Sequence, residues 1–339
     1  MVSLFQQNNT DSKCLATLSW DQSTVDNERP ILYVCIIASI VHAAFWLQLS
    51  FCPSVRQKTM QWLYAYLATD IFLLIRFFFL FIVHTTSTEC IPARAWELFV
   101  AYIEAIGDNY LNILEVYILL ALNLCRYIQI TRNKNVYVTN VRLLVVTHIA
   151  IYLLPAFFLI IQLPIGWGEL NSYSGNTCDI GYTTTFAVVL NIVVAFVLPI
   201  GLNILVIGAS VRHVHLTSQL QQAKHHVSAR EKYNRSLVIQ FTIFYTIWFL
   251  LWSPNIIIYQ FTSGVNTLTI IGKLLNFIEI SIDPIIVAAL DVRFYQAWKK
   301  TWTELKNRSL KKFGHEQRRI GPAVFTTTVN TVQQRITKV

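Results

Sequence analysis

Residues 182–209 read YTTTFAVVLNIVVAFVLPIGLNILVIGA, a stretch without a single charged side chain. At about 1.5 Å of rise per residue, a helix of this length crosses the roughly 30 Å hydrocarbon core of a bilayer. Together with other apolar stretches of similar length, it predicts an all-α integral membrane protein, built as a seven-transmembrane helix bundle. The predicted spans are residues 30–52, 59–83, 97–128, 142–163, 182–209, 236–261 and 265–290.

The composition of the chain agrees with burial in lipid. Hydrophobic residues make up 54% of its 339 residues, charged residues make up 13%, and the mean hydropathy is +0.48. Soluble domains carry about a quarter charged residues, so this surface is predicted to face a membrane. The spans divide the chain into an N-terminal segment (1–29), a seven-transmembrane domain (30–290) and a C-terminal segment (291–339).

Basic residues set the predicted orientation. One side of the membrane holds 22 of the 27 Lys and Arg residues, and the other side holds Lys13, Arg29 and Arg94. Because basic residues gather on the cytoplasmic side, the N-terminus is predicted to be extracellular and the tail cytoplasmic. The net charge of +9 then indicates contact with lipid headgroups, and nucleic-acid binding is not expected. On the outside, Asn8 begins an Asn-Asn-Thr sequence and is a predicted glycosylation site.

Short motifs stand at defined places on five of the spans. In chain order they are Asp70 in the second, Arg126-Tyr127 at the end of the third, Pro199 in the fifth, Trp252-Ser253-Pro254 in the sixth and Asp283-Pro284 in the seventh. This set, in this order, resembles the rhodopsin-like (class A) family of G-protein-coupled receptors over about residues 30–300.

The resemblance implies a plasma-membrane receptor that transmits the binding of an extracellular ligand to heterotrimeric G proteins, with arrestin as a further partner. The ligand is unknown, and a peptide or an amine would fit the family. The residues implied in activation and coupling are Arg126, Tyr127, Trp252, Pro254, Asp283 and Pro284. Aromatic and basic residues alternate from Asp291 to Arg308, which is similar to the family's amphipathic eighth helix.

Cysteine positions and some motif positions depart from the family's pattern. The resemblance implies a disulfide between the outer loops, which we expect to join Cys90 to Cys178, with Cys14 as the rival partner of Cys178. Cys125 and Asn234 stand where the family has the two acids that hold the arginine of the third helix. Arg126 therefore lacks both acidic partners. The first span also lacks the family's asparagine.

Polar residues follow one face of the third span. Glu104, Asp108, Asn112 and Glu115 are spaced i, i+4, i+8 and i+11, and Arg126 falls on the same face. A polar stripe at membrane depth must point into the bundle or into a water-filled cavity.

Four acids are expected to meet at mid-membrane, where the family has a sodium pocket: Asp70, Glu115, Glu279 and Asp283. Four neighbouring carboxylates cannot all stay charged without a cation. Two interpretations are open. Either protonated acids are hydrogen-bonded to one another, or the cluster senses sodium or protons. No other cofactor is expected.

Asp108 has two interpretations as well. It matches the aspartate with which amine receptors bind a ligand's ammonium group, but Arg76 in the second span faces the same cavity and would neutralise it in an internal ion pair. The residues expected at the ligand cavity are Arg76, Asp108, Asn112, Trp248, Asn255 and Tyr259.

The function predicted from these features is that of a signalling receptor. The alternative is a seven-helix ligand-gated channel or a transporter, in which the intramembrane acids would form an ion path. An enzyme is not expected, because the sequence has no nucleophile–base pair and no zinc-ligand spacing.

The orientation can be tested directly. With epitope tags at both ends, the N-terminal tag should stain on intact cells and the C-terminal tag only after permeabilisation, as the distribution of basic residues requires. Tags visible at both ends on intact cells would exclude seven spans, and a C-terminal tag visible alone would reverse the predicted orientation.

Overall fold

The computed structural model describes residues 18–52, 55–56, 60–87, 93–132, 136–171, 178–222, 229–261 and 267–290, with scattered positions between 294 and 307. Asn8, Cys14 and Cys90 lie outside the described residues, so the glycosylation site and the disulfide stay predictions. Only scattered residues after Leu290 are described, so the amphipathic eighth helix expected from Asp291 to Arg308 also stays a prediction.

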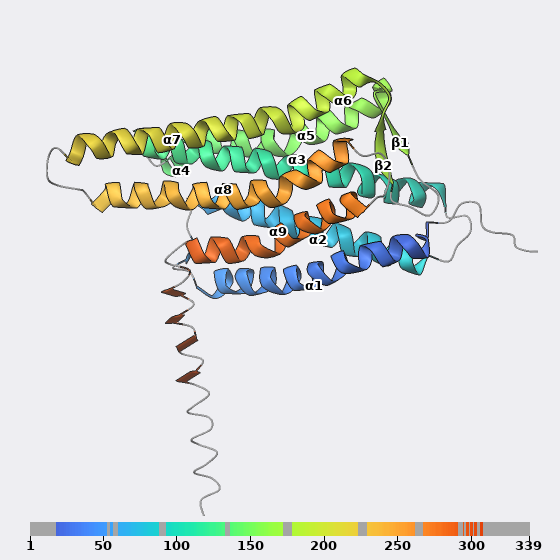
Figure 1. The fold of residues 1–339 in the computed structure, drawn as a ribbon, viewed down its shortest axis with the longest axis horizontal. Coiled ribbons are helices and arrows are strands. Elements are labelled where there is room, and N and C mark those ends of the chain that lie inside the picture. Colours follow the sequence, from blue (N-terminus) through green and yellow to red (C-terminus); the bar gives the residue numbers. More distant parts are fainter. Residues whose placement is uncertain are drawn as a thin grey trace, which may run out of the picture. The chain divides into compact units, whose positions relative to one another are not determined.

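Long helices dominate residues 18–290 and run side by side (Figure 1). They are α1 (Gln22–Phe51), α2 (Gln61–Thr86), α3 (Arg94–Arg132), α4 (Val136–Thr139), α5 (Val141–Ile165), α6 (Thr185–Asn191), the π-helix η3 (Ile192–Val197), α7 (Leu198–Gln222), α8 (Ala229–Phe261) and α9 (Thr267–Leu290). The strands β1 (Gly168–Asn171) and β2 (Asp179–Tyr182) form an antiparallel hairpin at one end of the bundle, which we call the hairpin end. The opposite end, where α3 finishes, is the Arg126 end.

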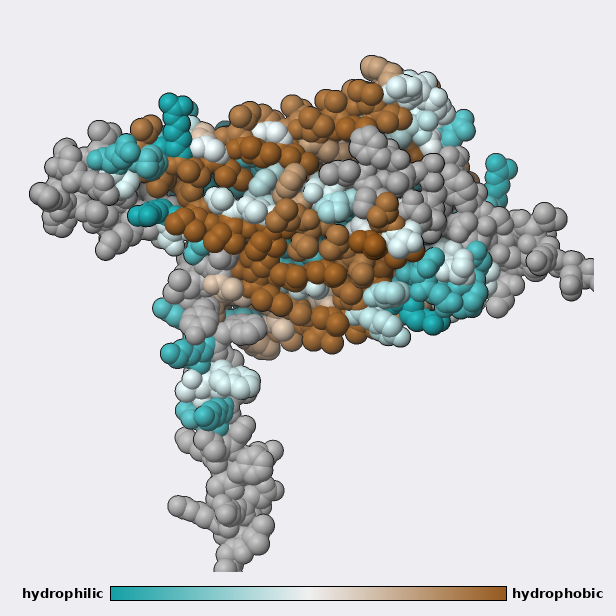
Figure 2. Space-filling model, in the orientation of Figure 1, coloured by the Kyte–Doolittle hydropathy of each residue, from teal (hydrophilic) through white to brown (hydrophobic). Residues whose placement is uncertain are grey.

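Among the described residues, five helical stretches are long and apolar enough to cross a membrane: α1, α2, α3, α5 and the continuous run 185–219 through α6, η3 and α7. Apolar side chains cover the middle of the bundle on the face drawn in Figure 2, and hydrophilic ones gather toward its ends. Helix α9 is not among these five stretches, because it carries three charged residues, Lys273, Glu279 and Asp283. The chain is a helical membrane bundle.

Two local features differ from the sequence-based expectation. Helix α1 begins at Gln22, inside the segment expected to be a free N-terminus, because the Asp21 side chain accepts a hydrogen bond from the Thr24 N–H at 2.7 Å and caps the helix. The hairpin was not expected in an all-α chain. It starts where Gly166, with φ of 78°, ends α5 in the left-handed region that glycine favours.

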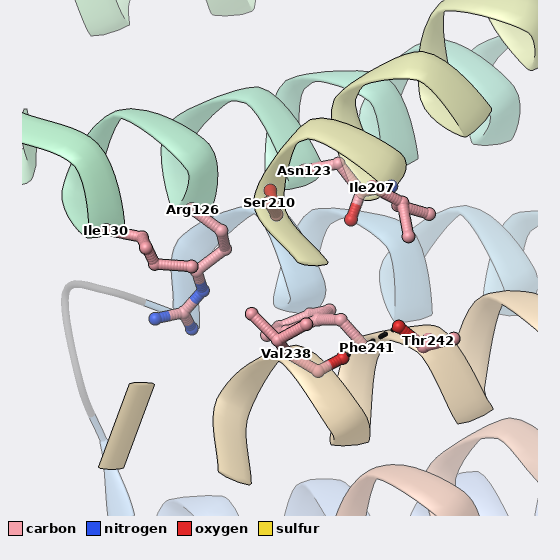
Figure 3. A pocket seen from close by; sticks show the side chains of 8 residues that line it. All are labelled: Asn123, Arg126, Ile130, Ile207, Ser210, Val238, Phe241 and Thr242. Carbon is pink, nitrogen blue, oxygen red and sulfur yellow. Dashed lines mark hydrogen bonds between the residues drawn. The ribbon is translucent and has the colours of Figure 1, made fainter. Parts of the chain in front are cut away.

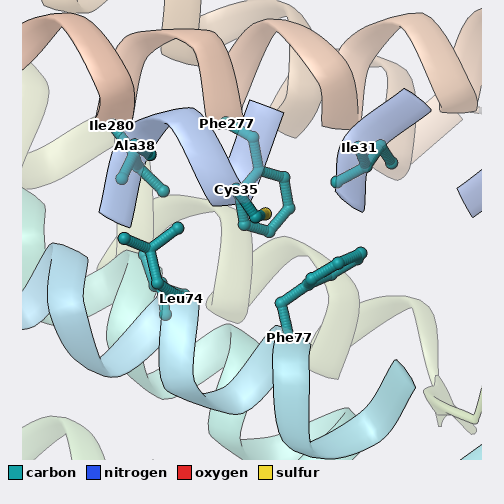
Figure 4. Packing of buried hydrophobic residues seen from close by; sticks show 8 residues of the cluster. Ile31, Cys35, Ala38, Leu74, Phe77, Phe277 and Ile280 are labelled. Carbon is teal, nitrogen blue, oxygen red and sulfur yellow. The ribbon is translucent and has the colours of Figure 1, made fainter. Parts of the chain in front are cut away.

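Helix α3 lies at the centre of the bundle, where it packs against α2, α5 and α7. Helix α9 packs against α1 and α8. Between α1, α2 and α9, the side chains in Figure 4 form a close-packed apolar cluster whose labelled members are Ile31, Cys35, Ala38, Leu74, Phe77, Phe277 and Ile280. Since lipid is as apolar as these side chains, such contacts stabilise the bundle through packing rather than through removal of water.

Side-chain amides join helices in the other half of the bundle. Gln162 of α5 and Asn191 of α6 are buried and donate to each other at 3.1 and 2.8 Å. Asn123 of α3 donates to Asn203 of α7 at 2.7 Å. The π-helix η3 ends just before Pro199, which has no N–H to give and disturbs the preceding turn. The helix is therefore interrupted before Pro199 by a π-helical turn.

The amide pair gives a stability prediction. Asn191→Leu leaves the buried Gln162 amide without its partner, so we expect destabilisation of about 1–2 kcal/mol and a lower thermal midpoint in detergent. The double variant Gln162→Leu with Asn191→Leu should recover part of this loss, because neither amide is then stranded. Asn109→Ala is the control, since the Asn109 side chain bonds only within α3, to the Ala105 carbonyl. Equal midpoints for both single variants would contradict the prediction.

Candidate functional site

The polar face of α3 carries the candidate site, which has three levels along the bundle. Glu104 and Asp108 lie near the hairpin end, Asn112 and Glu115 lie in the middle, and Arg126 lies at the other end. Asp108 is 41% exposed at its side chain, whereas the other four residues are buried. The structure thus turns the stripe expected from the spacing into the bundle, as charged groups at membrane depth require.

Arg76 of α2 is bound entirely by α3 at the first level. Its Nη1 lies 2.7 Å from Asp108 Oδ1. Its Nε donates to the Ile103 carbonyl at 3.0 Å, and its Nη2 donates to the Glu104 carbonyl. The aliphatic part of Arg76 passes Gly107 at 3.6 Å from where a Cβ would stand, an ordinary van der Waals distance. The internal ion pair considered from the sequence is present.

Two further pairs of ionisable side chains join helices at the hairpin end of the bundle. His84 Nε2 of α2 lies 3.4 Å from Glu104 Oε2 of α3, and both side chains are 5% exposed. Lys273 Nζ of α9 lies 3.2 Å from Glu28 Oε1 of α1. The hairpin end is therefore joined by ionisable pairs between α2 and α3 and between α1 and α9.

The β1–β2 hairpin packs on this level. Ile180 of β2 lies in an apolar cluster with Ala105 of α3 and with Cys178. Burial raises the pKa of the neighbouring Asp179 to about 7, and the nearby charge of Asp108 adds to the rise. Cys178 forms no disulfide within the described part of the chain.

Four acids meet at the second level, as expected: Asp70, Glu115, Glu279 and Asp283 are all fully buried and interact with one another. Among the described residues, neither oxygen of Asp70 or of Glu115 has a hydrogen-bond donor. The two carboxyl groups lie within reach of each other, so one shared proton would satisfy both.

Tyr66 indicates that protons are present in this cluster. Its hydroxyl lies 2.5 Å from Glu279 Oε1 and also contacts Asp283 Oδ2. A hydroxyl has one proton to donate, so only one carboxyl can accept it, and the other must carry its own proton to form a hydrogen bond. His42 of α1 completes the group, with Nε2 at 3.0 Å from the Ile280 carbonyl and 3.9 Å from Asp70 Oδ2.

Two tryptophans of α8 lie at the second level. Trp252 and Trp248 are fully buried and stacked, with ring centroids 4.7 Å apart. Trp252 Nε1 donates to Asn112 Oδ1 at 3.3 Å. This hydrogen bond connects the motif of the sixth predicted span to the polar face of α3.

The partners of Arg126 at the third level include three uncharged side chains. Arg126 donates to Met60 Sδ and to Gln129 Oε1, both at 3.3 Å, and its guanidinium lies 5.1 Å from the centre of the Phe241 ring. Side chains of α3, α7 and α8 surround a small recess here (Figure 3). The lining residues are Asn123, Arg126, Ile130, Ile207, Ser210, Val238, Phe241 and Thr242.

For the remaining predicted site residues, only the degree of burial is described. Tyr127, Pro254 and Asn255 are partly buried, Pro284 is buried beside Asp283, and the side chain of Tyr259 lies outside the described part. Within that part, no three His, Cys, Asp or Glu side chains are arranged as metal ligands, so sodium binding stays a prediction.

The sequence analysis missed His42, Tyr66, His84, Met60 and Phe241. Tyr66 and His42 had a usable signal, since each is a polar side chain inside an apolar run and Tyr66 stands one helical turn before Asp70. Met60 and Phe241 had none, because neither side chain is unusual at the edge of a membrane span.

The sequence matches no protein-family model and no curated protein. The fold does match known structures. The crystal structure of squid rhodopsin is similar with a TM-score of 0.64, over 84% of this chain and 86% of that chain, at 13% sequence identity. At this identity the likeness concerns the fold, and the chain has a rhodopsin-like helical bundle.

A test can separate the two interpretations of Asp108, which are an internal ion pair with Arg76 and the binding of a cationic ligand. Arg76 is 14% exposed, so Asp108→Asn strands a nearly buried cation, and we expect a loss of up to about 3 kcal/mol and reduced surface expression. Arg76→Gln should cost less, because Asp108 can reach water. Asp26→Asn is the matched control, since the Asp26–Arg29 pair is about half exposed on both sides.

Normal surface expression of Asp108→Asn with loss of ligand response would instead favour binding of a cationic ligand at Asp108.

Proposed function

We propose that the chain is a plasma-membrane receptor with seven spans, an extracellular N-terminus and a cytoplasmic tail, which activates heterotrimeric G proteins. In this proposal α8 and α9 are the sixth and seventh spans. The observation that carries it is the polar face of α3, which runs from ion pairs at the hairpin end to the recess at Arg126. The rhodopsin-like fold supports the same conclusion.

Activation in this proposal widens the recess between α3, α7 and α8. The recess is far too small for the terminal helix of a G protein, so α8 must move away from α3. Phe241 of α8 would then leave the guanidinium of Arg126, which becomes free to contact the incoming protein. Arrestin would bind the same opened recess.

The ligand would act at the hairpin end, where charged pairs join the helices. A ligand with a cationic group would compete with Arg76 for Asp108, and an anionic one would compete with Asp108 for Arg76. Either exchange changes the contact between α2 and α3. This is a differential interaction of the kind that shifts a two-state equilibrium.

Sodium or shared protons would act at the second level. A cation among Asp70, Glu115, Glu279 and Asp283 would hold α2, α3 and α9 together by neutralising their mutual repulsion. Its release, or a change in proton number, would allow these helices to shift.

The alternative is a channel or transporter, and the same buried acids are the observation that favours it. Ligand-dependent conductance in membranes free of G protein would establish this alternative. The receptor proposal is tested by a ligand screen read out on a panel of chimeric G proteins, with Arg126→Ala as the variant that must lose coupling.

Basal signalling gives the quantitative prediction. Because Cys125 and Asn234 stand where the rhodopsin-like family has the two acids that hold this arginine, we expect measurable ligand-free nucleotide exchange on the G protein. Cys125→Asp supplies a neighbouring carboxylate and should stabilise the resting state by about 1–3 kcal/mol, which lowers basal activity about 5- to 150-fold. Cys125→Ser is the control of similar size without the charge. A silent wild type together with an unchanged Cys125→Asp variant would contradict this account of Arg126.

A further inference from the structure

Each of two ion pairs at the hairpin end has one member that water can reach. In the Arg76–Asp108 pair, the Asp108 side chain is 41% exposed and the Arg76 side chain is 14% exposed. In the Glu28–Lys273 pair the charges are reversed, since Lys273 is 33% exposed and Glu28 is 9% exposed. The accessible member is therefore an anion on α3 and a cation on α9.

The accessible side chains of Asp108 and Lys273 lie on buried faces of their helices. Glu104 and Asn112, one turn before and one turn after Asp108 on α3, are both buried. Asn276, one turn after Lys273 on α9, is buried as well. The charge of Lys273 interacts with the charges of Asp108 and Glu104. The two accessible groups therefore belong to one polar region inside the hairpin end.

Within the described part of the chain, both side chains keep hydrogen-bonding capacity that the protein does not use. The Arg76 guanidinium approaches Asp108 at Oδ1, and no described residue donates a hydrogen bond to Oδ2. Lys273 carries three N–H donors, and among the described residues it gives one of them, to Glu28 Oε1 at 3.2 Å. Asp108 and Lys273 thus offer a free acceptor and free donors to a third molecule.

The charges around these two groups select the kind of ligand. Among the described residues, the acids here are Glu28, Glu104, Asp108 and Asp179, and the bases charged at neutral pH are Arg76 and Lys273. The acids stay in excess even when a protonated His84 is counted with the bases. A ligand that is only an anion would add to this excess, and one that is only a cation would leave the donors of Lys273 unused. A molecule with one ammonium and one carboxylate complements both groups without changing the net charge.

We propose that the hairpin end binds a small zwitterion, whose ammonium group contacts Asp108 and whose carboxylate contacts Lys273. The proposal rests on the proposed function only in placing the ligand at this end of the bundle. The ammonium would enter at Oδ2 of Asp108 and compete with Arg76, while the carboxylate would compete with Glu28 for Lys273. Because α3 packs mainly against α2, α5 and α7 while α9 packs mainly against α1 and α8, one bound molecule would join helices with different packing partners.

The test compares zwitterions with their singly charged analogues on purified full-length protein in lipid nanodiscs. The zwitterions are unbranched ω-amino carboxylates graded in length from glycine to ε-aminocaproate, because one of them must match the separation of Asp108 and Lys273. The analogues are the alkylamine and the alkyl carboxylate of the same chain length. A ligand that binds the folded protein raises its thermal midpoint, and the dependence on ligand concentration gives Kd. We expect at least one zwitterion to bind about tenfold more tightly than either analogue, since it makes a second charged contact within one molecule.

A double variant identifies the second contact. Glu28→Gln with Lys273→Met removes the pair between α1 and α9 as a whole, so neither charge is left without its partner. The best zwitterion should then bind no more tightly than its alkylamine, whose own affinity should stay the same. Asp26→Asn with Arg29→Gln is the matched control, because it removes an ion pair of α1 that is about half exposed on both sides. This control should keep the preference for the zwitterion.

Two results would overturn the proposal. One is a wild type that binds every zwitterion no better than the tighter of its two analogues, and this result requires no variant to fold. The other is a double variant that unfolds cooperatively and keeps the full preference. Nucleotide exchange on the G protein is measured separately, because binding in nanodiscs requires no G protein. Absent coupling with an intact preference counts against the receptor proposal alone, and the reverse counts against the zwitterion alone.

Discussion

The constraint on which this structure depends is that ionisable groups at membrane depth must find their partners inside the protein. A charged side chain in hydrocarbon costs several kcal/mol, and no water is at hand to reduce that cost. The chain meets this constraint with α3 at the centre and its polar face turned inward. Side chains of α2 and α9 contact this face at the hairpin end and in the middle of the bundle. These polar contacts fix the positions of α2 and α9 more closely than apolar packing alone would.

Much of the bundle can be predicted from the sequence, because polar residues that must face the interior recur at helical spacing. The spacing of Glu104, Asp108 and Glu115 predicts a buried stripe, and the motif positions predict that Asp70 meets Glu115. What the sequence does not give is pairing between distant segments. Glu28 and Lys273 lie on the first and last described helices, and no periodicity relates them. The hairpin is also invisible, because its strands have four residues each and their polar composition resembles that of any loop.

Arg126 is also a buried charge, and its contacts with uncharged groups are weaker than an ion pair. A buried arginine paired with a carboxylate is held by charge, and separating the pair leaves two uncompensated charges. The contacts of Arg126 include a sulfur acceptor, an amide oxygen and an aromatic face, and each of these is a weaker partner than a carboxylate. The sequence shows that the two acids expected beside Arg126 are missing, but it does not show which side chains contact Arg126 instead. Methionine and phenylalanine are ordinary residues at the edge of a membrane span. The resting contact is consequently easier to break, and it is the contact that lies beside the recess.

The three levels stand on one helix, and this limits how they can influence one another. From Glu104 to Arg126 is about 33 Å along α3, and the hydrogen bonds of a continuous helix do not rearrange along its length. Coupling must therefore pass through the helices that contact α3 at more than one level. Helix α2 does so through Arg76 and Asp70, and α8 does so through Trp252 and Phe241. A shift of α2 at the hairpin end changes the acid cluster, and a change there reaches α8 through Asn112 and Trp252, so the bundle holds a contiguous physical route between its two ends.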